Sequence, residues 1–89
     1  MRIVPGFVVR RIAGETIAIP TGAAARELSG LIALNGSGKL LFDLLQQEQT
    51  EAALVNALLD SYDVDTATAQ ADMADFLQIL RSNDVLIEA

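Results

Sequence analysis

The sequence predicts an α+β fold in which a small antiparallel sheet of three strands comes first and three helices gather on one face of it. Three observations lead to this prediction. Strand-like patterns lie in the first part of the chain, at Phe7 to Ile12, Thr16 to Ile19 and Leu31 to Leu34. Helical spacing of apolar residues, with capping residues before each run, fills the remainder. The 89 residues, 52% of them hydrophobic, suffice for one core, so we expect a single domain over residues 1–89.

The first two strands are predicted to form a hairpin. Phe7 to Ile12 and Thr16 to Ile19 are rich in β-branched residues, and Ala13-Gly14-Glu15 between them supplies a glycine that can adopt positive φ. Pro20 then ends the second strand. The alternation within the hairpin predicts one buried face and one face that is at least partly wet, with apolar positions at Val8, Ile12, Ile17 and Ile19.

A loop and a third strand complete the predicted sheet. Thr21 to Glu27 has no strand pattern and is short for a helix, which favours a loop before the next element. Leu31-Ile32-Ala33-Leu34 is an apolar run of strand length.

The first two helices are marked by capping residues. Asn35 and Ser37 are N-cap candidates in front of an apolar run, and the first helix is expected from Ser37 to Gln47. Thr50 begins the second helix, whose apolar stripe consists of Leu54, Val55, Leu58, Leu59 and Tyr62.

The third helix is expected over residues 66–82. Asp65 caps its start, and Asn83 or Asp84 marks its end. A short apolar tail, Val85-Leu86-Ile87, follows.

Composition excludes several classes of function. Six Lys or Arg against twelve Asp or Glu give a net charge of −6, which repels nucleic acid and anionic membranes. Because the chain has no Cys and no His, it cannot build thiolate or imidazole metal sites, and we expect neither metal nor cofactor. No apolar run is long enough to cross a bilayer and the N-terminus is unlike a signal peptide, so we expect a cytoplasmic protein.

The motifs that suggest ligand binding or catalysis each lack residues that the motif requires. Gly36-Ser37-Gly38-Lys39 is similar to a phosphate-binding loop, but Ala33 stands where the first glycine belongs and Leu40 where a Ser or Thr belongs. A helix N-terminus explains the segment better. Asp63-Val64-Asp65 lacks the glycine and glutamate of a calcium loop. Since no catalytic nucleophile and base can be assembled either, we do not expect an enzyme.

Ile79 is the most informative single residue. At about 100° per residue it lies off the axis of the Met73, Leu77 and Leu80 stripe, beside two acids. Either the core is wide at this point or an apolar groove lies open there.

An ordered series of short segments resembles the PqqD family, the coenzyme PQQ synthesis protein D and its stand-alone relatives. The segments are Ala13-Gly14-Glu15-Thr16, Leu34-Asn35-Gly36-Ser37-Gly38, Leu44-Leu45, Thr50, Leu54, Leu58, Tyr62-Asp63-Val64-Asp65, Ala71-Asp72, Phe76-Leu77 and Leu80. They cover nearly the whole chain except Thr21 to Gly30. One departure is Asn83-Asp84-Val85-Leu86, where many relatives have a glycine.

The resemblance implies a winged-helix-like fold and a role as recognition element for ribosomally made, modified peptides. Such domains bind the leader segment of a precursor peptide and deliver it to a modifying enzyme, often a radical-SAM protein. The leader adds as an extra strand beside the third strand and leans on the third helix. Carried onto this sequence, the peptide-binding residues are Leu31, Ile32, Ala33, Leu34, Asp72, Asp75, Phe76, Ile79 and Asn83.

The alternative is a DNA-binding winged-helix transcription factor, since the architecture is shared. Its recognition helix should be basic, whereas the third helix here carries Arg81 alone against Asp72 and Asp75. A third possibility, a purely structural interaction protein, remains open at the level of sequence.

Overall fold

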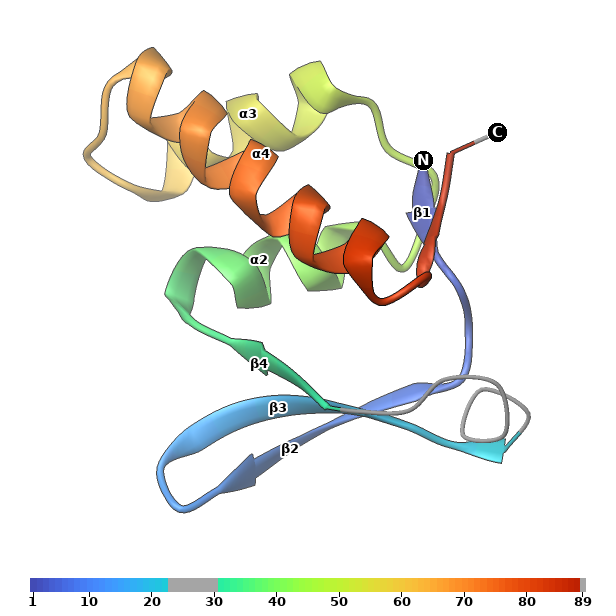
Figure 1. The fold of residues 1–89 in the computed structure, drawn as a ribbon. Coiled ribbons are helices and arrows are strands. Elements are labelled where there is room, and N and C mark those ends of the chain that lie inside the picture. Colours follow the sequence, from blue (N-terminus) through green and yellow to red (C-terminus); the bar gives the residue numbers. More distant parts are fainter. Residues whose placement is uncertain (23–30, 89) are drawn as a thin grey trace.

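A sheet of three strands lies beneath a layer of helices in the computed structural model, which describes residues 1–22 and 31–88 (Figure 1). The loop predicted from Thr21 to Glu27 falls mostly outside the described residues. In chain order the elements are β1 (Arg2–Ile3), β2 (Phe7–Ile12), β3 (Glu15–Pro20), β4 (Ile32–Leu34), α2 (Gly36–Leu44), α3 (Glu51–Ser61), α4 (Thr66–Ser82) and β5 (Leu86–Ile87). Within the described residues, the predicted order of three sheet strands and then three helices is confirmed.

The hairpin β2–β3 closes through a turn of two residues. Ala13 and Gly14 both have positive φ, 53° and 83°, the combination that matches the right-handed twist of the flanking strands. The ladder then pairs Ile12 with Glu15 and continues to Phe7 with Pro20, and β4 pairs antiparallel with β3.

The buried face of the hairpin is not the face marked by the isoleucines. Val9 lies opposite Ala18, which is fully buried and faces Ile32 in β4. On the same face the ring of Phe7 packs edge-on against Phe42 of α2, with centroids 6.1 Å apart. This face therefore meets the helices, whereas the apolar positions Val8, Ile12, Ile17 and Ile19 lie on the other face.

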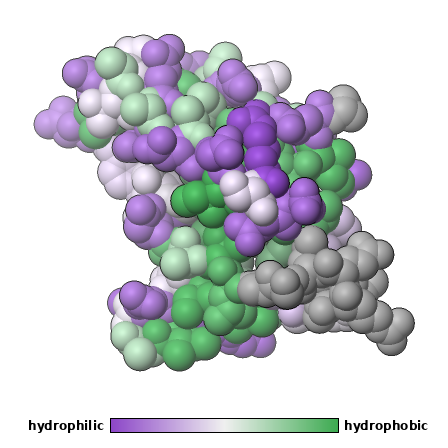
Figure 2. Space-filling view, in the orientation of Figure 1, coloured by the Kyte–Doolittle hydropathy of each residue, from purple (hydrophilic) through white to green (hydrophobic). Residues whose placement is uncertain are grey.

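The outer face of the sheet is consequently apolar. Val8, Ile12, Ile17 and Ile19 share this face with Arg10 and Glu15, because side chains alternate along a strand. Ile12 is 49% exposed. Figure 2 shows hydrophobic colour gathered over the sheet, whereas hydrophilic colour dominates over the helices.

Each helix begins at a side chain that accepts a hydrogen bond from its first turn. Asn35 accepts from the Gly38 N–H at 2.9 Å, Thr50 from Ala53 and Asp65 from Thr68. The caps of α3 and α4 are the predicted ones. Helix α2 starts one residue earlier and ends three residues sooner than predicted, because the chain tightens after Leu44 into a turn.

Helix α4 ends where predicted, in a Schellman motif. Asn83 is the C-cap, the Val85 N–H donates to the Leu80 carbonyl at 3.1 Å, and the Asp84 N–H donates to the Arg81 carbonyl at 3.1 Å. Asp84 has φ of 57°, the left-handed position that glycine prefers. This explains why the missing glycine is compatible with the fold: an aspartate adopts its conformation.

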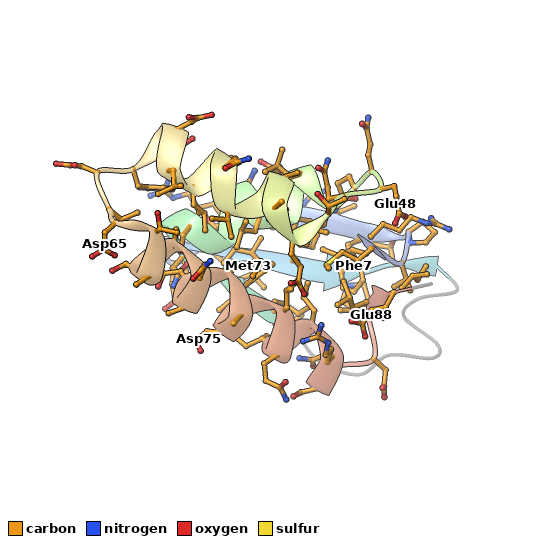
Figure 3. The ribbon with its side chains drawn as sticks, turned by 90° about the horizontal axis from the view of Figure 1, so that it is seen from above. Phe7, Glu48, Asp65, Met73, Asp75 and Glu88 are labelled. Carbon is orange, nitrogen blue, oxygen red and sulfur yellow. The ribbon has the colours of Figure 1, made fainter. Side chains whose placement is uncertain are left out.

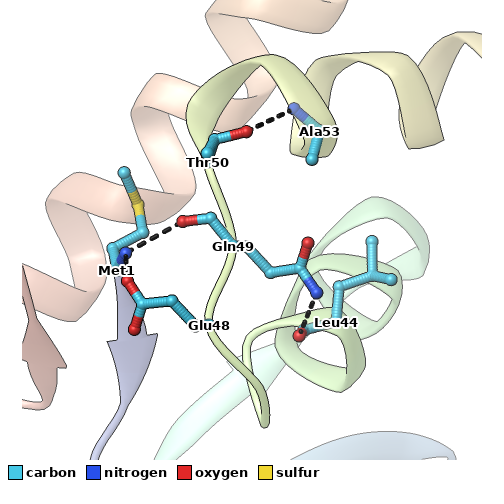
Figure 4. A network of polar contacts seen from close by, with 6 residues as sticks. All are labelled: Met1, Leu44, Glu48, Gln49, Thr50 and Ala53. Atoms are coloured by element: carbon cyan, nitrogen blue, oxygen red, sulfur yellow. Dashed lines mark hydrogen bonds and ion pairs between the residues drawn. The ribbon is translucent and has the colours of Figure 1, made fainter.

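The two ends of the chain pair with each other, which the sequence did not predict. Arg2 lies opposite Ile87 and Ile3 opposite Leu86, so β1 and β5 form a separate two-stranded sheet. The Met1 ammonium donates to the Glu48 carboxylate and to the Gln49 carbonyl, which ties the start of the chain to the segment before α3 (Figure 4).

Candidate functional site

One edge of the sheet is open beside α4. Strand order in the described sheet is β2-β3-β4, so β4 has a neighbour on one side only. Ile32 and Leu34 are 3% and 5% exposed because their side chains enter the core, whereas Ala33 and the preceding Leu31 are exposed. An open strand edge presents backbone N–H and C=O groups that another chain can pair with.

A hollow of about 110 Å³ adjoins the end of this strand, at Asn35. Its lining comes from the N-terminus of α2 and from one side of α4, and consists of Asn35, Ser37, Gly38, Asp72, Asp75, Phe76 and Ile79. Four of the predicted site residues therefore come together, those of α4 from Asp72 to Ile79. The three residues from the α2 end were missed, although the Gly-Ser-Gly segment was the available signal.

Gly38 allows the two helices to approach closely at the hollow. A Cβ atom at this position would lie 3.0 Å from Asn35 Oδ1 and 3.3 Å from Phe76 Cε1, which is tighter than normal packing. The glycine thus brings the Phe76 ring against the first turn of α2. The Gly36-Ser37-Gly38 segment is confirmed as a helix N-terminus.

The hollow combines an apolar wall with an acidic rim. Phe76 is 6% exposed and forms the base, whereas Ile79 is 46% exposed and stands open. Asp72 is half-buried and Asp75 is exposed. Figure 3 shows Asp75 on the side of α4 away from α3, opposite in direction to Met73. Of the two alternatives for Ile79, the wide core is wrong, because the side chain is open to solvent; it lines a hollow of mixed polar and apolar character beside the two acids.

Asn83 lies outside the hollow. Its side-chain amide donates to the Ile79 carbonyl at 2.8 Å, one turn earlier in α4. The residue therefore stabilises the end of the helix that carries Ile79, and this bond occupies one of its two amide hydrogens.

Two other hollows are present in the described part of the chain. One of about 530 Å³ lies between α3 and α4 and includes Glu51, Val55 and Met73. It is larger, but no open strand edge borders it. The other, of about 280 Å³, lies beside β4 near the hairpin turn and is lined by Gly14, Glu15, Thr16, Ala33, Leu34 and Asn35.

The charges of α4 disfavour the DNA-binding alternative. Arg81, the only cation of the helix, donates to Glu88 Oε1 at 2.7 Å. This hydrogen bond raises the pKa of Arg81 and lowers the pKa of the Glu88 carboxyl. The cation is thus already paired, and the remaining charges of the helix, Asp72 and Asp75, repel phosphate.

The described residues contain no group of three or more metal-ligating side chains. None of their helices has the length and apolar character that crossing a membrane requires.

Comparisons with known proteins identify a family and two structures of similar fold. The family model of coenzyme PQQ synthesis protein D (PqqD) matches residues 16–86. Among solved structures, TbiB1 in complex with the TbiA(beta) leader peptide is 24% identical, with a TM-score of 0.73, over 100% of this chain and 98% of that chain. A lasso peptide synthetase B1 complexed with the leader peptide is 18% identical, with a TM-score of 0.70, over 98% and 96%. Among curated proteins, nothing matches.

Proposed function

This chain belongs to the family of coenzyme PQQ synthesis protein D (PqqD), and from that premise we propose that it binds the leader segment of a ribosomally made precursor peptide. The bound leader adds as a strand beside β4 and rests on α4. The protein acts as a peptide-presenting partner and performs no catalysis itself.

The observation that carries this proposal is the open edge of β4 beside the hollow of α2 and α4. Strand addition gives affinity through backbone hydrogen bonds, and neighbouring pockets give specificity for side chains. The two structural neighbours, each solved with a leader peptide, have the same fold over nearly their full length, which supports a shared mode of binding.

The residues proposed to bind the leader divide into three groups. The residues Leu31 to Leu34 contribute mainly backbone groups, because the side chains of Ile32 and Leu34 belong to the core. Asp72, Asp75, Phe76 and Ile79 contribute the side chains of the hollow. Asn83 acts at a distance by holding the last turn of α4, and its second amide hydrogen is available to the peptide.

The partner that receives the leader is proposed to be a peptide-modifying enzyme, with a radical-SAM protein as the first candidate, in the cytoplasm. The support is the family alone. Affinity purification with each candidate enzyme, with and without leader peptide, tests this part separately.

The leader rather than the modified core should carry the binding. A short edge strand beside one small hollow can hold only an extended segment of about one strand length. Isothermal titration calorimetry should give a measurable Kd for the full precursor and for its isolated leader, and none for the leaderless core. Equal affinity for the leaderless core would contradict the proposal.

A further inference from the structure

The register of the sheet decides which residue of β4 offers its backbone to an added strand. In an antiparallel pair, a residue directs both its N–H and its C=O either to one neighbour or away from it, and this direction alternates along the strand. A hairpin turn of two residues is closed by a hydrogen-bonded pair, here Ile12 with Glu15. Odd-numbered residues of β3 therefore bond to β2. The Thr21 N–H, which donates to the Gly6 carbonyl at 2.7 Å, continues this pattern beyond the strand.

The even-numbered residues of β3 must then bond to β4. Thr16 faces Leu34 and Ala18 faces Ile32, so these two residues of β4 direct their backbone groups into the sheet. Ala33 lies between them and directs its N–H and C=O to the open edge.

The same alternation separates the side chains of a strand added at this edge. Residues directly opposite each other in a sheet point to the same face, so a peptide residue opposite Ala33 has its side chain on the outer face, beside Ile17 and Ala33. Its two neighbours point to the helix side, where Phe76 and Ile79 line the hollow of about 110 Å³.

A second hollow borders the same edge at its hairpin end. This outer hollow, of about 280 Å³, is lined by Ala33 and Glu15 from the outer face and by Thr16 and Leu34, whose side chains lie on the helix side. It shares Asn35 and no other residue with the hollow next to α4. Of the residues that line the outer hollow, Glu15 carries a charge and Asn35 carries an amide. The volume of this hollow is sufficient for a large side chain, and its groups suit one that ends in a hydrogen-bond donor.

We infer that the bound peptide is anchored by the backbone of Ala33 and is recognised on both faces of the sheet. Alternate side chains enter the hollow at Ile79 and the outer hollow at Ala33 and Glu15. This inference rests on the proposed leader binding, and it adds a second specificity pocket at the hairpin end of the edge, where Ala33 and Glu15 lie on the outer face.

The anchor is tested with Ala33→Pro. Proline removes the outward N–H of this residue without removing a bond to β3, and an edge strand tolerates it at such a position. Leader binding should weaken about tenfold or more in Ala33→Pro, since the peptide carbonyl loses its donor. If Ala33→Pro binds the leader as strongly as the wild type, the backbone anchor at Ala33 is wrong, but the proposed leader binding is not. If the wild-type protein does not bind the leader, both the anchor and the proposed function are wrong.

A peptide-side measurement does not depend on how the proline variant folds. N-methylation of single leader residues should weaken binding to the wild-type protein about tenfold at alternate positions of the strand and have little effect between them. Equal sensitivity at consecutive residues would overturn the assigned register.

Recognition on both faces is tested by coupling between protein and peptide variants. Each leader residue is truncated to Ala and titrated against the wild-type protein, Ala33→Leu and Ile79→Ala, which gives a double-mutant cycle for every position. The leader residue coupled to Ala33 and the residue coupled to Ile79 should lie an odd number of positions apart. The inference would be overturned if both variants coupled to the same leader residue or to two residues an even number of positions apart. It would also be overturned if only Ile79→Ala showed coupling.

Discussion

Truncation of Ile79 to Ala should weaken leader binding and leave the fold nearly unchanged. Complete burial of an isoleucine side chain stabilises by about 1.5–3 kcal/mol, and 46% of Ile79 is exposed in the free protein. A peptide that covers the exposed part would gain about 0.7–1.4 kcal/mol, so its loss should raise Kd about three- to tenfold. The measurement is a leader titration by calorimetry.

The stability of the same variant separates binding from packing. An Ile→Ala change in a packed interior costs roughly 2–5 kcal/mol, whereas a half-exposed helical site should cost below about 1 kcal/mol because alanine also favours the helix. Ile12→Ala is the matched control, since Ile12 is 49% exposed and lies on β2, separated from the open edge by β3. A sharp fall in the melting temperature of Ile79→Ala with normal leader binding, or equal weakening by both variants, would refute the groove.

Three further predictions concern charge and backbone conformation. A leader that carries Lys or Arg should bind about two- to fivefold more weakly at high salt than at low salt. The double variant Asp72→Asn, Asp75→Asn should reduce this salt dependence. If the affinity of the wild-type protein does not change with salt, the two acids are only solvated. Asp84→Gly should stabilise the protein by about 0.5–1 kcal/mol, seen as a melting temperature a few degrees higher, because glycine adopts positive φ without strain. The hydrogen bond from the Thr68 N–H lowers the pKa of Asp65. The ionised cap therefore stabilises the folded protein above the ordinary carboxyl pKa, and this stabilisation is lost as the pH falls through the lowered pKa. Asp65→Asn should have the melting temperature of the wild type near neutral pH, and its melting temperature should fall less on acidification.

The sequence predicted the helix boundaries where a local signal was present. The side-chain oxygens of Thr50 and Asp65 each accept a hydrogen bond from the N–H three residues later, so these N-caps can be identified from the sequence alone. The end of α4 followed from Asn83 and Asp84, although the left-handed conformation of Asp84 required the structure.

The face of the hairpin could not be predicted from alternation alone. Both faces carry apolar residues, and the choice is made by a distant contact, the Phe7 ring against Phe42. Alternation along a strand indicates that its two faces differ, but it does not indicate which face packs against the helices. The pairing of β1 with β5 was missed for a related reason, because two-residue strands have too little pattern to detect.

Four of the residues that line the candidate hollow were named from the sequence, and the three from the start of α2 were not. Ile79 and its neighbours on α4 could be predicted from helical geometry, because a rotation of 100° per residue shows which residues lie off the apolar stripe. The contribution of Asn35 and Gly38 depends on how closely α2 approaches α4, which is a property of packing between helices.

The pairing of β1 with β5 has a practical consequence for handling the protein. The two chain ends emerge side by side and away from the hairpin turn (Figure 1). A fluorophore or an affinity tag attached at either end therefore leaves the route to β4 unobstructed. For the same reason a short glycine-rich linker can join the two ends, and the chain can be reopened at the exposed turn of Ala13 and Gly14. Such a circular permutant would place a cargo at the hairpin turn, next to the hollow that Gly14 and Glu15 line.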